Sequence, residues 1–363
     1  MNILNIVGAR PNFLKIGPLM EAYRRHKDIE PLLVHTGQHY DRNMSELFFR
    51  DLGIPEPDEN LGVGSASQAA QTAAIMRAFE PVVVERKPDL VVVVGDVNST
   101  IACGLVAVKL GVRLAHVEAG LRSFDRTMPE EINRVLTDAI SDLLFCTEQN
   151  GVDNLLREGV AKEKIHLVGN VMIDSVLAHR ARAESSRVLE QLGLDEGGYS
   201  VLTLHRPANV DRHDVLEAIL DALAVIQSDM PIIFPVHPRT RKQLAGAAFA
   251  ERLEEMPNLR LLDPAGYLDF LKLMSHAKLV LTDSGGIQEE TAVLGIPCLT
   301  LRENTERPVT VEMGTNRVVG RDPERILAGY RDVLAGKLVR RGTPPLWDGH
   351  AAERIVKIMI GKT

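Results

Sequence analysis

The segment from His116 to Arg134, HVEAGLRSFDRTMPEEINR, concentrates side chains that could perform acid–base chemistry or bind anions. Its glutamates and arginines are Glu118, Glu130, Glu131, Arg122, Arg126 and Arg134. Carboxylates transfer protons, and planar guanidinium groups bind phosphate oxygens. The segment follows an apolar run, and ligands of open parallel sheets bind at the ends of strands. A solvated charged loop is the alternative interpretation, and the rest of the chain argues against it.

Cations follow the first apolar run, which ends in Gly8-Ala9-Arg10-Pro11 with Lys15 in the early turns of an expected helix. A dinucleotide-binding fold carries G-x-G-x-x-G at this place, but the chain has neither that fingerprint nor a Walker A motif. Side-chain cations at a helix N-terminus suit a diphosphate instead. A structural ion pair is the other role open to Arg10.

A glycine pair marks a second candidate site, in the stretch VLTDSGGIQEETA at residues 280–292. An apolar strand here ends in Thr-Asp-Ser-Gly-Gly and turns into a helix. Gly285 and Gly286 would let a phosphate approach the helix N-terminus, while Ser284 donates a hydrogen bond. Glu290, in the first turns, could accept hydrogen bonds from two ribose hydroxyls. A tight turn without a ligand is the alternative.

Single polar residues end two further strands. Asp96 follows the run VVVVG and is either an acid–base group or a helix cap. His205 precedes Arg206 in TLHRPAN, where it is either a structural histidine or a partner of a pyrophosphate. His35 and His39 have a four-residue spacing, but no matching acid or cysteine set accompanies them, so we expect no metal.

Apolar runs alternate with segments of helical periodicity along the whole chain. The predicted strands are 3–7, 32–35, 90–94, 114–117, 143–146, 201–204, 232–236, 259–262, 279–282 and 298–301. The predicted helices include 13–25, 68–86, 100–109, 130–141 and a polar stretch over 173–192. Such alternation is typical of parallel sheets covered on both faces. We therefore predict an α/β fold with two Rossmann-like domains whose parallel sheets face a cleft.

The expected domains are an N-terminal one at residues 1–170 and a C-terminal one at 171–345, with a hinge near Asn170. Residues 346–363 should form a final helix that packs back on the N-terminal domain.

Composition narrows the class of protein. The chain has 363 residues, 45% of them hydrophobic and 25% charged, and a formal net charge of -7. Nucleic-acid-binding surfaces are normally basic, so we expect no nucleic-acid partner. The three cysteines lie far apart in or beside apolar runs, which is typical of reduced thiols in a cytosolic protein. With no apolar run of membrane-spanning length and no signal peptide, we expect a cytoplasmic protein without membrane association.

An ordered set of motifs resembles the non-hydrolysing UDP-N-acetylglucosamine 2-epimerases. The pieces are GARPNFLK, HTGQH, GDVNST, HVEAGLRS, MPEEINR, TLHR, TDSGGIQEE and TERPVTVEMGTN, spread from residue 8 to residue 316. Each piece is weak alone, but the ordered set is highly specific. The resemblance implies a GT-B fold like that of glycogen phosphorylase. It also implies an isomerase without a cofactor that supplies UDP-ManNAc for polysaccharide biosynthesis.

The implied reaction interconverts UDP-GlcNAc and UDP-ManNAc at C2, through elimination of UDP to 2-acetamidoglucal and re-addition. The implied catalytic residues are Asp96, Glu118, Glu130 and His205. The implied substrate-binding residues are Arg10, Lys15, Arg134, Ser284, Gly285, Gly286 and Glu290, of which Glu290 matches the ribose-binding glutamate. The C-terminal domain would bind UDP, and we expect a homodimer.

Three other functions remain open. The segments HTGQHYDRNMS and SFDRTMPEEINRVLTD resemble a sister group acting on UDP-2,3-diacetamido-2,3-dideoxy-glucuronate, whereas TDSGGIQEE and TERPVTVEMGTN favour UDP-GlcNAc. A GT-B glycosyltransferase would share the Ser-Gly-Gly turn and Glu290 but would not need Glu118 and Glu130. A non-catalytic sensor of nucleotide sugars should lack some of the matched acids, and all are present.

Two departures from the family pattern concern regulation. Pro207 and Ala208 replace the Arg-Glu pair of many bacterial members, and Asp41 stands where a more neutral residue is expected. These regions help such enzymes bind a second, activating UDP-GlcNAc. We therefore predict that conversion of pure UDP-ManNAc starts without a UDP-GlcNAc primer. Initial-rate kinetics test this, and a lag abolished by trace UDP-GlcNAc would contradict it.

Overall fold

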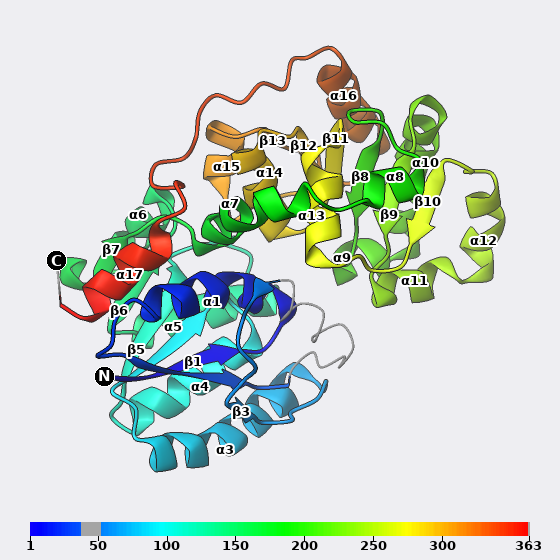
Figure 1. The fold of residues 1–363 in the computed structure, drawn as a ribbon. Coiled ribbons are helices and arrows are strands. Elements are labelled where there is room, and N and C mark those ends of the chain that lie inside the picture. Colours follow the sequence, from blue (N-terminus) through cyan, green and yellow to red (C-terminus); the bar gives the residue numbers. More distant parts are fainter. Residues whose placement is uncertain (38–51, 362–363) are drawn as a thin grey trace. The chain divides into compact units, whose positions relative to one another are not determined.

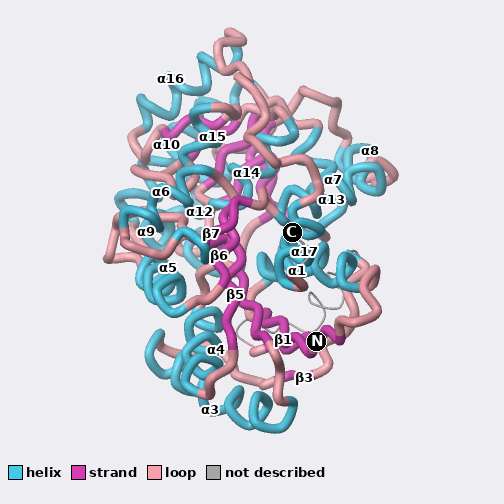
Figure 2. Tube along the Cα trace, turned by 90° about the vertical axis from the view of Figure 1, so that its left-hand side faces the viewer, coloured by secondary structure: helices cyan, strands magenta, loops and turns pink. Residues whose placement is uncertain are grey.

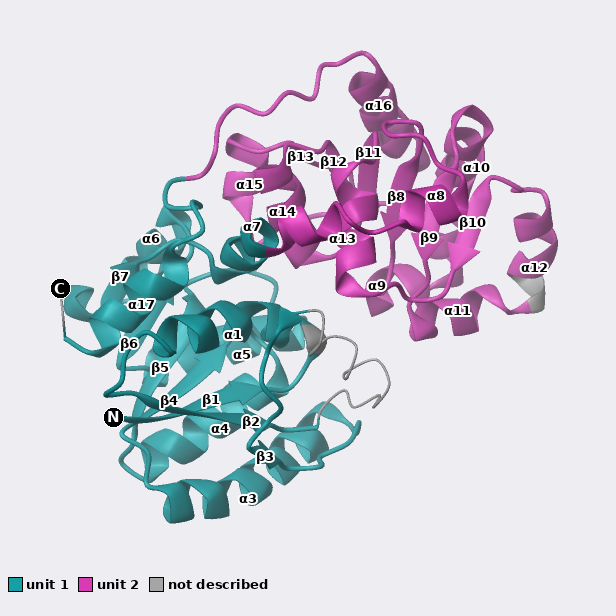
Figure 3. Cartoon of the chain, in the orientation of Figure 1, with its two compact units in different colours: residues 1–178, 345–363 teal, residues 179–344 magenta. Residues whose placement is uncertain are grey.

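Two compact units make up the chain in the computed structural model, which describes residues 1–37 and 52–361. Unit 1 comprises residues 1–178 and 345–363, and unit 2 comprises residues 179–344 (Figure 3). The division falls within α7 (Val171–Ala183), the first helix after the expected hinge. His39 and Asp41 lie outside the described residues.

Unit 1 contains a seven-stranded parallel sheet with helices on both faces (Figure 1). Its strand order is β3 (Glu59–Asn60), β2 (Glu30–His35), β1 (Asn2–Val7), β4 (Leu90–Val94), β5 (Arg113–Ala119), β6 (Leu143–Cys146) and β7 (Ile165–Leu167). Its helices are α1 (Arg10–Tyr23), α3 (Gln68–Arg86), α4 (Asn98–Lys109), α5 (Pro129–Ile140), α6 (Gln149–Arg157), most of α7, α17 (Ala351–Met359) and the 3₁₀ turn Lys162–Lys164. The strand order reverses between β1 and β4, the position where ligands of this fold class bind.

Unit 2 repeats the design with a six-stranded parallel sheet. Its strand order is β10 (Leu259–Leu262), β9 (Ile232–Pro235), β8 (Ser200–Thr203), β11 (Leu279–Thr282), β12 (Cys298–Thr300) and β13 (Asn316–Val318). Its helices are α8 (Val188–Leu192), α9 (Pro207–Val210), α10 (His213–Asp229), α11 (Pro238–Leu244), α12 (Ala247–Glu254), α13 (Tyr267–Ser275), α14 (Gly285–Leu294), α15 (Pro308–Glu312) and α16 (Pro323–Leu334). Here the order reverses between β8 and β11. The predicted α/β class with two parallel sheets is confirmed.

The apolar strands form the cores of both units. Every residue of β4, LVVVV, is buried, which explains why the sequence shows a continuous apolar run there instead of alternation. Such a strand has no solvent face, so residues with chemical roles must lie beyond its end. Among the described residues, no helix is both long and apolar enough to cross a lipid bilayer.

The last helix returns to unit 1. α17 packs beside α1 (Figure 2). Between the two helices, the hydroxyl of Tyr23 lies 3.8 Å from the sulfur of Met359. The buried carboxylate of Asp174, on α7, accepts hydrogen bonds from the Ala351 and Ala352 amides at 3.2 and 2.8 Å. It thereby satisfies donors at the N-terminus of α17 that have no partner within the helix.

The polar stretch predicted as a single helix over 173–192 is instead divided between α7 and α8. The hydroxyl of Ser185 donates to the Arg182 carbonyl oxygen at 2.7 Å, and that of Ser186 accepts from the Val188 amide at 3.2 Å. Serine side chains that bond nearby backbone groups compete with the helix, which accounts for the break.

Candidate functional site

The carboxyl ends of β1, β4 and β5 meet at one edge of the unit 1 sheet because the three strands pair in parallel. Glu118 leaves this edge from β5, and Lys15 reaches it from α1. The ammonium of Lys15 and the carboxylate of Glu118 form an ion pair, and each residue is 6% exposed. The structure thus brings together two residues that are 103 positions apart.

Glu118 has an unusual backbone conformation. Its φ is 76°, in the left-handed region that residues other than glycine rarely adopt. The pairing of β5 with β6 shifts there, from Val117 opposite Phe145 to Ala119 opposite Cys146, so Glu118 is the extra residue of a β-bulge. Bulges redirect a side chain, and such strained conformations cluster at functional sites.

The backbone at Gly95 lies close to the side chains of this ion pair. A Cβ on Gly95, whose φ is +69°, would lie 2.9 Å from the Lys15 Nζ and 3.5 Å from the Glu118 Oε2. Only glycine therefore fits at the end of β4. Asn12 ties the neighbouring turn together, because its Oδ1 accepts from the Gly8 and Ala9 amides at 3.1 and 2.9 Å and its Nδ2 donates to the Val94 carbonyl at 3.0 Å.

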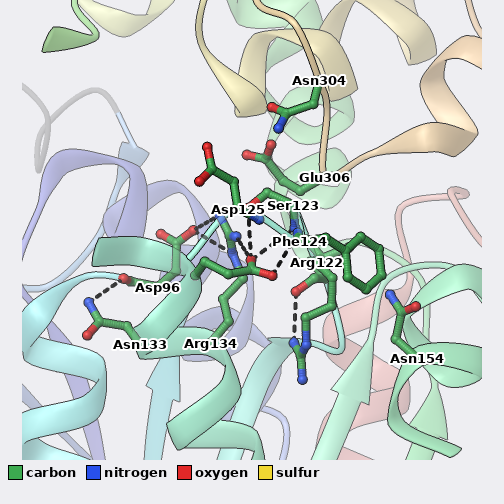
Figure 4. Close-up of polar contacts among 12 residues, drawn as sticks. Asp96, Arg122, Ser123, Phe124, Asp125, Asn133, Arg134, Asn154, Asn304 and Glu306 are labelled. Atoms are coloured by element: carbon green, nitrogen blue, oxygen red, sulfur yellow. Dashed lines mark hydrogen bonds and ion pairs between the residues drawn. The ribbon is translucent and has the colours of Figure 1, made fainter. Parts of the chain in front are cut away.

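Asp96 directly follows Gly95 in the sequence, and residues of α5 bond it (Figure 4). The guanidinium of Arg134 donates to Asp96 Oδ2 from Nε at 3.0 Å and from Nη2 at 2.8 Å. Its Nη1 bonds Glu131 at 2.5 Å. Asn133 donates to the Asp96 carbonyl oxygen at 2.9 Å. Arg134, which was expected to bind substrate, therefore hydrogen-bonds the carboxylate of Asp96 directly.

The two adjacent glutamates of α5 have different environments. Glu131 is buried and accepts from the amides of Ser123 and Phe124, both at 2.9 Å, which fixes the loop before the helix. Glu130 is only half-buried, and among the described residues it has no hydrogen-bonding partner. Arg10 begins α1, but its side chain is not among the parts described.

A buried carboxylate organises the corresponding edge of unit 2. Asp283, fully buried after β11, accepts from the amides of His205 and Arg206 and from the Asn209 side chain, and its Oδ1 lies 2.9 Å from His205 Nδ1. Burial alone would raise the pKa of Asp283, but the His205 charge and these hydrogen bonds lower it below its usual range. The pairing fixes the imidazole and leaves Nε2 as the ring nitrogen that Asp283 does not engage.

Ser284 and the glycine pair open α14, as the sequence predicted. Ser284 is the N-cap residue, and its amide donates to the hydroxyl of Thr282 at 2.9 Å. Gly285 and Gly286 form the first helical positions. A Cβ on Gly285 would lie 2.5 Å from Nη1 of Arg307, so the glycine permits a guanidinium to approach the helix N-terminus.

Sequence reasoning did not identify Arg302 and Arg307, two of the cations around this helix end. Arg302 and Arg307 each bond Glu306, at 2.8 and 2.7 Å, and Arg206 lies 3.7 Å from the same carboxylate. Burial and the neighbouring arginines lower the pKa of Arg302 despite Glu306. Its buried Nη1 has no hydrogen-bond acceptor among the described residues. The TERP motif was a signal for Arg307, while Arg302 stood in no recognised motif.

Glu290 is a buried acid in the middle of α14. It is 4% exposed, and no hydrogen-bonding partner for its carboxyl group occurs among the described residues. Burial, and then the charge of Glu289, raises the pKa of Glu290 to about 8. A ligand that offers hydroxyl donors would supply what this carboxylate lacks. The residues that the structure describes contain no cluster of three His, Cys, Asp or Glu side chains suited to a metal ion.

The sequence matches known proteins over nearly its whole length. A family model described as UDP-N-acetylglucosamine 2-epimerase matches residues 21–360. A UDP-N-acetylglucosamine 2-epimerase of Methanocaldococcus jannaschii is 43% identical over 364 residues, which cover 99% of each chain. A UDP-2,3-diacetamido-2,3-dideoxy-D-glucuronate 2-epimerase of Pseudomonas aeruginosa is 42% identical over 363 residues, again 99% of each chain.

Solved structures show the same fold. The Methanocaldococcus jannaschii UDP-GlcNAc 2-epimerase in complex with UDP-GlcNAc and UDP has a TM-score of 0.93 and 42% identity, over 99% of this chain and 100% of that one. The Neisseria meningitidis UDP-GlcNAc 2-epimerase bound to UDP-GlcNAc has a TM-score of 0.89 and 28% identity, with the same coverage.

Replacement of Glu290 by Gln should change how stability depends on pH. Since the folded-state pKa of about 8 exceeds the usual 4.5, the folded protein holds this proton more tightly than the unfolded chain. The resulting stabilisation is complete below pH 4.5 and is lost as the pH rises through about 8. We expect the melting temperature of the ligand-free wild type to fall, relative to Glu290→Gln, over that range.

Differential scanning fluorimetry at several pH values measures this difference. The exposed Glu251→Gln variant is the matched control and should follow the wild type. Parallel curves for the wild type and Glu290→Gln would show that Glu290 has no raised pKa.

Proposed function

The chain belongs to the UDP-N-acetylglucosamine 2-epimerase family, which confirms the resemblance found in its motifs, and we propose that it interconverts UDP-GlcNAc and UDP-ManNAc at C2. The observation that carries this proposal is the buried Lys15–Glu118 ion pair on the bulge of β5, next to the strand end that bears Asp96. Burying charge is costly, and pairs of this kind concentrate at functional sites.

The chemistry explains why such groups are needed. The C2 hydrogen of the sugar is not adjacent to a carbonyl group, so a carboxylate alone cannot remove it. When the C1–O bond breaks, its electron pair leaves with UDP and positive charge develops on the ring, which acidifies the hydrogen at C2. A carboxylate then takes the proton, and the C2–H electron pair forms the C1=C2 bond of 2-acetamidoglucal. Protonation of the opposite face and re-addition of UDP complete the inversion.

Unit 1 would supply the acid–base groups. Glu118, held beside the Lys15 ammonium, and Asp96, oriented by Arg134, can each transfer a proton. Glu130, half-buried and without a partner among the described residues, is a third candidate. Two faces of C2 must be served, which requires at least two such groups in different positions. This need accounts for several carboxylates at one sheet edge.

Unit 2 would hold the uridine diphosphate. The N-terminus of α14, with Ser284, Gly285 and Gly286, is a suitable place for phosphate oxygens. Arg307 lies against Gly285, and Nη1 of Arg302, which has no acceptor among the described residues, would gain one from an anion. Such cations stabilise the charge that develops on the departing diphosphate. The ribose hydroxyls would provide the missing donors for Glu290.

A second substrate remains a candidate. The Pseudomonas aeruginosa enzyme for UDP-2,3-diacetamido-2,3-dideoxy-D-glucuronate is as similar to this chain as the archaeal UDP-GlcNAc enzyme, at 42% against 43% identity. The same elimination and re-addition would serve that sugar. Proton NMR of the protein with each UDP-sugar separates the two activities.

Assembly and compartment are further parts of the proposal. We propose a homodimer, because Ile132 and Leu136, four residues apart on α5, are 47% and 48% exposed and would be covered by a second copy. A cytoplasmic location is supported by Cys103, Cys146 and Cys298, which are buried as free thiols.

The reaction should proceed without added cofactor and exchange the hydrogen at C2. In heavy water, we expect UDP-GlcNAc and UDP-ManNAc to interconvert with deuterium incorporated at C2, because the glycal regains its hydrogen from an exchangeable acid. Proton NMR follows both changes together. A C2 epimer that retains its original hydrogen would contradict proton transfer by the protein.

Glu118→Gln should lower kcat by about 10²–10⁴-fold, because an amide cannot act as a general acid or base. UDP affinity, measured by titration calorimetry, should stay within about two-fold of the wild type. Glu21→Gln, the same change at an exposed position on α1, is the control and should leave kcat unaltered. Lost UDP binding with unchanged turnover of the bound substrate would instead make Glu118 a binding residue.

A further inference from the structure

A network of buried charged residues surrounds the backbone of Glu118, and none of these residues was among the expected site residues. His116, two residues before Glu118 on β5, is fully buried. Its Nδ1 lies 2.6 Å from Asp138 Oδ1, and its Nε2 lies 2.9 Å from the carbonyl oxygen of Gly95. A carbonyl oxygen can only accept, so Nε2 carries a hydrogen. Nδ1 faces the Asp138 carboxylate, so both ring nitrogens are engaged within unit 1.

The second carboxylate oxygen of Asp138 contacts residues that follow Glu118 in the sequence. Asp138 Oδ2 accepts from the Gly120 amide at 3.0 Å and lies 2.7 Å from Nη1 of Arg122. Arg122 in turn binds Glu158 through Nε and Nη2, at 2.8 and 2.6 Å. Although burial alone would raise the pKa of Asp138, His116 and Arg122 lower it below its usual range, which favours the ionised carboxylate.

These contacts hold the backbone on both sides of the bulge. Before it, the Gly95 amide donates to the Val117 carbonyl oxygen at 3.0 Å, and His116 holds the Gly95 carbonyl. After it, Asp138 holds the Gly120 amide, and Asn154 donates to the Gly120 carbonyl oxygen at 2.9 Å. A left-handed glutamate persists only where its surroundings determine it.

We propose that Asp138, acting through His116 and Gly120, is a positioning residue that holds the backbone of Glu118 in the geometry that proton transfer requires. This inference rests on the proposed epimerase function. Buried ion pairs contribute little to stability compared with apolar side chains of similar volume, so specific geometry is the better reason for this one. Asp138 itself is enclosed within unit 1, where it is 2% exposed, and its contacts are with the protein.

Asp138→Asn is the decisive variant. The amide keeps one acceptor oxygen for the Gly120 N–H, but it turns an N–H donor towards His116 or Arg122 and removes the negative charge that pairs with Arg122. The bulge should relax, and small misplacements of a reacting group cost about 10²-fold in rate. We expect kcat to fall by about 10–100-fold, with KM and the Kd for UDP within about two-fold of the wild type.

A double-mutant cycle distinguishes positioning from general stability. If Asp138 acts through Glu118, Asp138→Asn should have little further effect on kcat in a Glu118→Gln background, because the group it positions is already gone. Multiplicative losses in the double variant, or a loss of UDP affinity that matches the loss of kcat, would overturn the proposal. A wild-type protein that does not epimerise either UDP-sugar would overturn the proposed function instead.

Two more variants serve as a control and as an alternative to Asp138→Asn. Asp142→Asn is the matched control, because Asp142 accepts the amide of Leu114 at 3.0 Å at the opposite end of β5, and it should keep full kcat. Asn154→Ala releases the Gly120 carbonyl without changing any charge, so it serves if Asp138→Asn does not fold. We expect a smaller fall in kcat, about three- to ten-fold, that again disappears in the Glu118→Gln background. A fall that persists there would contradict positioning.

Discussion

The Lys15–Glu118 ion pair is the interaction on which unit 1 depends, because both charges are buried at the meeting point of three strands. Transferring each ion from water into the protein interior costs a free energy on the order of several kcal/mol. The attraction between the two ions offsets this cost only when their geometry is fixed. The surrounding features meet that requirement. Gly95 leaves room for the two side chains, Asn12 ties the turn after β1 to β4, and the bulge in β5 directs Glu118 towards Lys15.

Much of the fold followed from the sequence because buried parallel strands leave a strong pattern. Runs such as LVVVV have few alternative explanations, and the bounds of β4 and α3 were predicted correctly. The short strands β3, β7 and β13 escaped prediction, since two or three residues carry no periodicity. The break between α7 and α8 also escaped, because it depends on serine side chains that bond the backbone.

The candidate site was predictable only in part. Motifs brought Lys15 and Glu118 to attention, but the sequence could not show that they form one buried pair. It predicted that Arg134 binds substrate, and it could not show that the guanidinium also bonds Asp96 and Glu131. The sequence does not distinguish two adjacent glutamates, and only the structure shows that Glu131 is buried whereas Glu130 is half-buried. Contacts between residues far apart in the chain decide such roles, and spacing does not report them.

Both units place an aspartate–histidine pair at the edge of the sheet where ligands are expected, and exposure separates what the two pairs can do. His116 is fully buried, and its two nitrogens bond Asp138 and a backbone carbonyl, so it has no capacity left for a ligand. The side chain of His205 is 40% exposed, and Asp283 engages only its Nδ1. A histidine held on one side can present its other nitrogen to an anion, whereas one held on both sides can only brace the backbone. Under the proposed function, the same pair of residue types would support proton transfer indirectly in unit 1, whereas in unit 2 it would be able to contact the diphosphate directly.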